Sequence, residues 1–456
     1  MMRDVMSKHV HWVRFPYDAV MSDQVLHESE AALRRNRIFA TSGVLIEWYD
    51  FMIYGLLATT IQRVFYPVDN SSVGLILTFA TFAVGYLARP IGGLVIGRIG
   101  DTRGRKFALV LATTLMLIPL FVITVLPTYQ MIGIWAPMLL TLMRLMQGFS
   151  VGGEYTGALT ALSESADESA RGRSVSLGLA TAMGGNLVAA AVVFLTTVIW
   201  GEDALVNGTW RIPYAIGFVF ALISVFLQRK MHETESFEES KHAGGTGNPV
   251  RVLISQYPVA AIVMLALATW SGVTVYTMVG WLPSYLETVI GVSSQRADAA
   301  SMIVSLVYVI VVFPIALLGD RVGRRKLMFW VIGGYVVLAF PAIMALNVGA
   351  ILGAIVAMAI LAVLQAFVDS TSTTEMTECV PTRVRYTGLA ITYSIGMIIG
   401  SFTPTLEQTL YSVTNSIYVP AFVIIGVSIL VLPVVIVLPR YVQRARAEQA
   451  RVTLTA

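Results

Sequence analysis

The chain has 456 residues, of which 56% are apolar and only 13% are Asp, Glu, Lys or Arg. A soluble domain carries roughly a quarter of charged residues, so this composition excludes a soluble enzyme and a disordered chain, and the single cysteine excludes a disulfide scaffold. The net charge of +4 could suggest a nucleic-acid partner, but the location of the charge argues against one. Lys and Arg sit at the ends of apolar runs and form no basic stripe.

Apolar runs bounded by Gly, Pro and charged residues predict twelve helices, each with the length of about 20 residues that a bilayer requires. The sequence therefore predicts an all-α membrane protein that is embedded in a lipid bilayer. The first 37 residues are polar and show no cleavable secretory signal. The predicted helices are residues 38–65, 73–99, 107–127, 133–163, 173–200, 211–228, 252–286, 298–318, 327–346, 348–378, 386–413 and 416–438.

Positive charge in the short loops predicts the orientation of these helices. Lys and Arg follow helices 2, 4, 8 and 10 and fill the C-terminal tail, while the opposite loops are nearly bare of positive charge. The positive-inside rule then places both termini in the cytoplasm. We expect a cytoplasmic tail at 1–37, a bundle at 38–228, a cytoplasmic central loop at 229–251, a second bundle at 252–438 and a cytoplasmic tail at 439–456.

The two halves of the sequence repeat one another. The segment Gly100–Lys106 after helix 2 recurs as Gly319–Lys326 after helix 8, and Gln147 and Gln365 hold matching places in helices 4 and 10. These matches at a nearly constant offset predict two pseudo-symmetric six-helix bundles. Repeats of this kind place the substrate near the bilayer midplane, between the halves.

Three ionisable residues are predicted near that midplane: Glu47, Asp50 and Arg144. Glu47 lies about nine residues into helix 1, which is roughly 14 Å into a hydrocarbon core about 30 Å thick. A charge at this depth needs a partner or a task. Arg144 could hold a carboxylate through paired N–H groups, with Glu47 or Asp50 as the proton-coupling residue. The alternative is a buried ion pair with a structural role only.

Other polar and aromatic residues in the helices leave two readings open. Gln147 and Gln365 could bind substrate or hold helices together, and Tyr276 and Trp281 of helix 7 could line the cavity or pack. Arg89 could belong to a gate or to helix packing, and Glu154 lies near the cytoplasmic end of helix 4, where a gating pair is favoured. Asp369 and Glu375 occupy the matching part of helix 10, so a gating or helix-end role is favoured over substrate contact.

The sequence contains no phosphate-binding Gly loop, no metal-ligand cluster and no nucleophile–base set, so we expect no enzyme activity, cofactor or metal. All five histidines lie outside the predicted helices, which makes them poor candidates for a proton relay.

Several strings carry a resemblance. Gly97–Lys106 and Arg144–Gly148 resemble two signature motifs of the major facilitator superfamily, and the strings 47–51, 89–93, 147–155 and 210–213 resemble its metabolite:proton symporters. That family includes bacterial proline/betaine, α-ketoglutarate, citrate and shikimate transporters. The resemblance implies that loop charges fasten and release the cytoplasmic side. The gating residues expected are Arg89, Asp101, Arg105, Glu154, Glu164, Arg171, Asp320, Arg324, Glu378 and Arg383.

Motifs and midplane charges together predict a transporter that imports a small carboxylate-bearing metabolite by proton symport. The substrate stays open between a proline/betaine-type zwitterion and an organic acid such as α-ketoglutarate or citrate. The runner-up is a drug/proton antiporter, whose cavity should be larger and mostly apolar. We expect a monomer in the bacterial inner membrane, coupled to protons rather than sodium.

Overall fold

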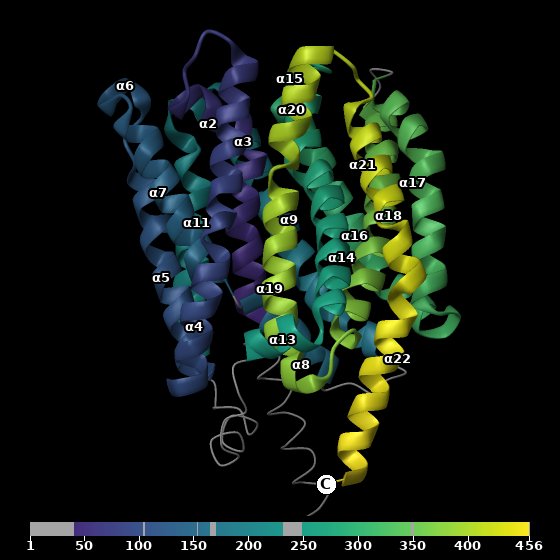
Figure 1. Ribbon diagram of the computed structural model, residues 1–456. Coiled ribbons are helices and arrows are strands. Elements are labelled where there is room, and N and C mark those ends of the chain that lie inside the picture. The colour runs from purple at the N-terminus through teal and green to yellow at the C-terminus, as the bar shows by residue number, and fades with distance from the viewer. Residues whose placement is uncertain are drawn as a thin grey trace, which may run out of the picture.

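The computed structural model describes residues 41–103, 105–152, 154–164, 170–230, 249–347 and 351–455. Throughout these ranges the regular structure is helical, with no strand. A helix satisfies its own backbone hydrogen bonds, which suits long apolar segments because lipid offers no partner for a free N–H or C=O group. Figure 1 shows most helices of the first half at the left, in purple to teal, with α8 and α9 nearer the centre, and most of those of the second half at the right, in green and yellow.

The first half begins with a helix at Thr41–Leu56, which bends by 63° into α2 at Ala58–Phe65. The elements that follow are α3 (Ser71–Leu87), α4 (Arg89–Arg103), α5 (Arg105–Val125), α6 (Tyr129–Ile132), α7 (Trp135–Val151), α8 (Glu154–Glu164), α9 (Arg171–Trp200), α10 (Glu202–Ala204), the π-helix η2 (Leu205–Thr209) and α11 (Arg211–Arg229).

The second half begins at α13 (Pro249–Gln256). The elements that follow are α14 (Pro258–Tyr276), the π-helix η3 (Thr277–Trp281), α15 (Leu282–Thr288), α16 (Ser294–Val322), α17 (Arg324–Leu346), α18 (Ile351–Glu378), α19 (Thr382–Ser401), α20 (Thr403–Thr414), α21 (Val419–Leu430) and α22 (Leu432–Thr455).

Twelve membrane spans follow from these elements, as the apolar runs predict. Within the described ranges, ten helices are long and apolar enough to cross a bilayer, and the bent pair Thr41–Leu56 and Ala58–Phe65 makes an eleventh. The twelfth is α7 with α8, which together cover the predicted fourth helix. The halves meet where α9 lies along α16 and where α3 lies along α20.

The side chains divide as a membrane protein requires. Large apolar side chains point outward, with Leu430 78% exposed and Val337 67% exposed, whereas Glu47, Asp50 and Arg144 are fully or almost fully buried. This is the reverse of a soluble protein, because lipid covers the outer surface and the polar groups find partners inside the bundle.

Glycines bring the helices of the first half into close contact where the ionisable residues lie. A Cβ atom on Gly148 of α7 would lie 1.7 Å from the carbonyl oxygen of Gly85 on α3, so neither helix could approach as closely with a larger residue. Gly85 in turn packs against the backbone of Arg144. The close crossing of α3 and α7 therefore fixes the depth of Arg144.

The last helix is longer than the sequence predicts. The apolar pattern ends at residue 438, but α22 continues through Pro439 to Thr455. Two contacts of its polar part explain the extension: Arg446 binds Glu378 of α18 at 2.5 Å, and Glu448 accepts a hydrogen bond of 2.6 Å from Tyr257. Hydropathy finds only the apolar part of a helix, and tertiary ion pairs hold the rest.

Candidate functional site

An ion pair joins the first helix to α4 inside the first half. Arg89 Nη2 donates a hydrogen bond of 2.6 Å to Glu47 Oε1, and both residues are buried. The guanidinium lies over the rings of Phe51 and Tyr86, at 4.8 and 4.5 Å from their centroids. Glu47 Oε2 and Arg89 Nε have no hydrogen-bond partner among the described residues. A predicted proton-coupling residue and a predicted gating residue thus form one buried pair.

A second polar group lies beside the first, around Gln147. This side chain accepts a hydrogen bond of 2.9 Å from Arg144 Nη1 and donates one of 2.7 Å to Asp50 Oδ1. All three residues have no exposed surface. Gln147 therefore lies between the Arg144 guanidinium and the Asp50 carboxylate and links them by two hydrogen bonds in place of a direct salt bridge.

Arg144 keeps unused hydrogen-bonding capacity. Its Nε and Nη2 atoms, and Oδ2 of Asp50, have no partner among the described residues. The guanidinium instead lies over Phe51 and Tyr54, at 4.6 and 4.5 Å from the ring centroids. Buried N–H groups without partners are costly, and a guanidinium offers donors that match a carboxylate. Arg144 therefore keeps donors of the kind that a carboxylate can accept from.

The second half contains a carboxylate that the sequence analysis assigned to a gate or a helix end. Asp369 of α18 accepts hydrogen bonds from Ser271 (2.5 Å), Gln365 (2.9 Å) and Tyr308 (2.7 Å). It is buried, and within the described ranges no Arg or Lys pairs with it. The signal in the sequence is Gln365, which lies four residues earlier on the same helix face.

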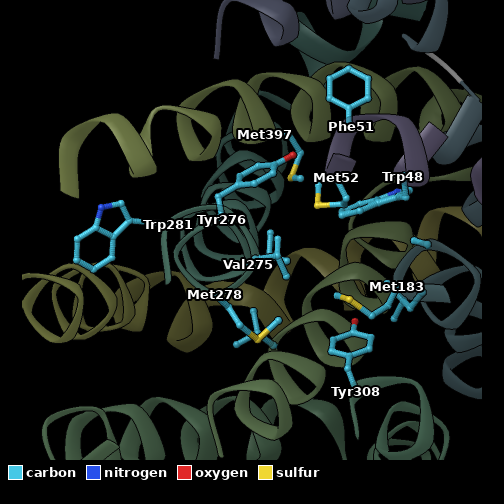
Figure 2. Packing of buried hydrophobic residues seen from close by; sticks show 14 of the residues in the cluster. Trp48, Phe51, Met52, Met183, Val275, Tyr276, Met278, Trp281, Tyr308 and Met397 are labelled. Carbon is cyan, nitrogen blue, oxygen red and sulfur yellow. The ribbon is translucent and has the colours of Figure 1, made fainter. Parts of the chain in front are cut away.

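A pocket between the halves is bordered by Asp369. The pocket is nearly closed, with a cavity volume of about 10 Å³, and side chains of both halves line it. Figure 2 shows Trp48, Met183, Val275 and Tyr308 arranged around this region from four different helices. The polar and aromatic residues of its lining are Trp48, Tyr155, Ser271, Tyr308, Asp369 and Tyr393.

The two aromatic residues singled out in helix 7 lie elsewhere. The Tyr276 hydroxyl forms a hydrogen bond with the Tyr86 hydroxyl, which links the halves. Trp281 donates from Nε1 to Gln408 at 3.0 Å and stacks on Tyr285 with 4.7 Å between ring centroids. Trp281 lies apart from Trp48 in Figure 2. Neither residue is among those that line the pocket.

Asp320 connects the halves near the end of α16, where α9 begins. Its carboxylate accepts hydrogen bonds from the backbone N–H groups of Gly172 and Arg173, at 3.2 and 3.1 Å, at the start of α9. A carboxylate at a helix N-terminus is stabilised by the free N–H groups and by the helix dipole. Arg324 also binds Asp320, at 2.9 Å.

Glu378 is the centre of the same cluster. It binds Arg324 at 2.8 Å, Arg171 at 3.4 Å and Arg446 at 2.5 Å. Glu375 lies 3.6 Å from Arg324, so the structure brings this residue into the predicted gating set. The predicted gating side chains of Asp101, Arg105, Glu154, Glu164 and Arg383 lie outside the part of the chain that the structure describes.

The opposite end of the bundle is also held by contacts between the halves. Thr59 donates a hydrogen bond of 2.6 Å to Glu287, and Thr197 donates one of 3.2 Å to Asp298. The sequence analysis missed both carboxylates because they lie close to predicted helix ends, where a charge is ordinary. The pocket is therefore enclosed between two sets of contacts, one toward each face of the membrane.

Comparisons with known proteins agree on one family. Residues 40–404 match the model of the Major Facilitator Superfamily. The glycine betaine/proline/ectoine/pipecolic acid transporter OusA of Dickeya dadantii is 32% identical over 423 residues, which are 90% of this chain and 83% of that protein. The proline/betaine transporter of Escherichia coli K12 is 31% identical over 413 residues, covering 88% of this chain and 82% of the relative.

Solved structures show the same fold. A crystal structure of a D-xylose–proton symporter superposes with a TM-score of 0.70 at 18% identity and covers 88% of this chain and 97% of its own. The partially occluded, inward-open form of the xylose transporter XylE from E. coli gives a TM-score of 0.71, also at 18% identity, over 90% of this chain and 98% of its own.

Proposed function

This chain belongs to the Major Facilitator Superfamily and is a solute transporter, not an enzyme, and from that premise we propose that it imports a small zwitterion of the proline/betaine type together with protons. The names of its relatives support the substrate class. Between the two options that the sequence left open, a zwitterion is therefore favoured over an organic acid.

The observation that carries this proposal is the buried Arg144 with two unpaired nitrogen atoms. Leaving buried donors unsatisfied costs about 1–3 kcal/mol per group, and a substrate carboxylate would satisfy them. Asp50 does not satisfy them, because its carboxylate binds Gln147, at 2.7 Å. Arg144 is therefore the proposed anchor for the carboxylate end of the substrate.

Proton coupling follows from competition for the same cations. Glu47 is bound by Arg89, and Asp50 is linked to Arg144 through Gln147. When a substrate carboxylate approaches these arginines, the protein carboxylate that it displaces is left buried without a counter-charge. Protonation removes that cost, so substrate and proton bind together more readily than either binds alone.

Alternating access would use the contacts at the two ends of the bundle. We propose that the end of the bundle with the Asp320 cluster faces the cytoplasm, because the start of α9, the end of α16 and the start of α17 carry the basic residues Arg173, Arg321, Arg325 and Lys326. The Asp320 cluster is then the cytoplasmic gate, and Thr59–Glu287 belongs to the outer gate. Both termini would be cytoplasmic, in the inner membrane of a bacterium, and one chain suffices because the pocket lies between its own halves.

Transport by the purified protein in liposomes tests the proposal. An inward proton gradient should drive accumulation of labelled glycine betaine or proline above the external concentration, and a proton ionophore should abolish it. A sodium gradient alone should drive nothing, and α-ketoglutarate and citrate should not compete. Accumulation of an organic acid instead, or proton-driven export of an apolar drug, would overturn the proposed function.

A further inference from the structure

The pocket between the halves combines aromatic rings with one carboxylate. Trp48 and Tyr155 come from the first half, and Tyr308, Tyr393 and Asp369 come from the second. Aromatic faces attract a cation through the ring quadrupole, most strongly when water is excluded. A carboxylate among such faces adds a full negative charge. The lining is thus complementary to a small organic cation.

Asp369 lacks a positive counter-charge. Its three hydrogen-bond donors are Ser271, Gln365 and Tyr308, all neutral groups, and none of the described Arg or Lys residues lies within ion-pair distance of it. Three neutral donors hold the carboxylate in place without cancelling its charge. The first half differs, since Glu47 and Asp50, the buried carboxylates among its described side chains, each have an arginine beside them, directly or through Gln147.

The rings pack against one another in this closed state, so a small head group would enter as they move apart. Tyr155 packs edge-on to Trp48 with 5.8 Å between centroids, and lies tilted against Tyr393 at 5.2 Å. Trp48 is 8% exposed, and its Nε1 atom has no hydrogen-bond partner among the described residues. Trp48 belongs to the first half, so a residue that lines the pocket carries an unpaired donor.

We propose that the Trp48–Tyr155–Tyr308–Tyr393 pocket with Asp369 holds the ammonium head group of the transported zwitterion. This inference rests on the proposed function and assigns the cationic end of the substrate to the second half. The carboxylate end then points toward the first half, where Trp48 Nε1 and the arginines offer donors. Because each charge of the zwitterion engages a different half, substrate binding draws the halves together.

An organic anion fits this pocket poorly. A second carboxylate in place of the ammonium group would face Asp369 and be repelled, whereas a quaternary ammonium group needs no hydrogen bond and can lie against the rings. Asp369 would therefore select the zwitterion, and the arginines of the first half alone would not.

The test compares two ligands of the same shape. Glycine betaine and 3,3-dimethylbutanoate differ only in having nitrogen or carbon at the branched centre, so only the first carries a positive charge. Binding to the purified full-length protein is measured by calorimetry and by displacement of labelled betaine. The wild type should bind glycine betaine at least tenfold more tightly than the carbon analogue.

Asp369→Asn should lose most of this preference, with betaine affinity falling at least tenfold and the affinity for the carbon analogue changing little. Glu407→Gln is the matched control, because Glu407 is a buried carboxylate of the same half, bound by Thr277 at 2.8 Å, that lies outside the pocket. It should keep the preference. Tyr393→Leu should lose more betaine affinity than Tyr393→Phe, since the phenylalanine keeps the aromatic face.

The outcomes separate two failures. If Asp369→Asn keeps the betaine preference but loses proton-driven accumulation, Asp369 binds the proton and the pocket assignment is wrong. Equal losses in Tyr393→Leu and Tyr393→Phe would also overturn it, and this comparison remains available if Asp369→Asn does not fold. If the wild type binds no zwitterion at all, the proposed function itself fails.

Discussion

Arg89 binds Glu47 through a hydrogen bond of 2.6 Å, from the start of α4 to the first helix, with both side chains buried in the first half of the protein. The sequence analysis gave these two residues separate roles, one in a gate and one in proton coupling. Their direct contact means that any proton gained by Glu47 changes the charge balance at Arg89. The pair therefore couples protonation to the packing of α4.

Glu47→Gln should abolish proton-driven accumulation while keeping substrate binding and exchange of internal for external substrate. The amide cannot carry a proton through the cycle, but it retains an oxygen that can accept a hydrogen bond from Arg89. Removing one charge of a buried pair can cost about 3–5 kcal/mol, so folding is checked by gel filtration first. Accumulation and exchange are then measured in the same liposomes.

Asp50→Asn is the companion variant, because Asp50 lies one turn further on the same helix and reaches Arg144 only through Gln147. Full accumulation in Glu47→Gln, together with its loss in Asp50→Asn, would move the proton-coupling role to Asp50. Full accumulation in both variants would rule out this helix as the proton carrier.

Arg144→Lys should reduce uptake at least tenfold, mainly by raising KM, although the charge is kept. A lysine cannot reproduce the planar pair of N–H donors that matches a carboxylate, and that pair is worth more than about 1.4 kcal/mol. Arg211→Lys is the matched control, since Arg211 also lies over an aromatic ring, Trp210 at 4.4 Å, but outside the site. Near-normal KM in Arg144→Lys would make Arg144 a structural residue.

Asp320→Ala should weaken closure at the end of the bundle with the Asp320 cluster and slow turnover, with substrate affinity changed less than about threefold. The change removes the acceptors of the Gly172 and Arg173 N–H groups and the partner of Arg324, worth about 1.5–3 kcal/mol for each charged hydrogen bond. Asp320→Asn keeps one acceptor oxygen and should show a smaller effect.

Closure at this end can be followed at Ser163, which is buried and bound to Thr377 of the other half at 2.9 Å. In a Cys379→Ser background, Ser163→Cys should react faster with an impermeant thiol reagent when Asp320→Ala is added, and no faster with Lys326→Gln, which changes an exposed charge at the start of α17. Parallel losses of affinity and turnover would contradict a gating role for Asp320.

Two adjacent glycines give a stability test. A Cβ atom on Gly185 would lie 2.3 Å from the carbonyl oxygen of Leu45 and 3.1 Å from Cβ of Trp48, while one on Gly184 would meet nothing within 4 Å. Gly185→Ala should cost about 1–3 kcal/mol and displace the helix that carries Trp48, so both the thermal midpoint and uptake should fall. Gly184→Ala should keep both, since alanine favours a helix. Equal behaviour of the two variants would contradict this packing.

Local pattern in the sequence was sufficient to predict the number of spans, the duplication and the burial of Glu47, Asp50 and Arg144 inside the first half. Apolar runs, loop charges and the pairing of Gln147 with Gln365 are local features, and lipid makes them decisive because a buried charge or a free backbone group is costly there. The polar end of α22 escaped the same reasoning, since it is held by Glu378 and Tyr257 rather than by an apolar face.

Only the tertiary structure decided which residues share the pocket. The sequence favoured a gating or helix-end role for Asp369 and left Trp281 open between lining the cavity and packing. In the structure Asp369 lines the pocket and Trp281 stacks on Tyr285. A rotation of one residue along a helix changes the direction of a side chain by about 100°, which depth in the membrane does not report. Which side chains face one another across the two halves depends on packing between segments that lie far apart in the chain. No single segment of the sequence determines it.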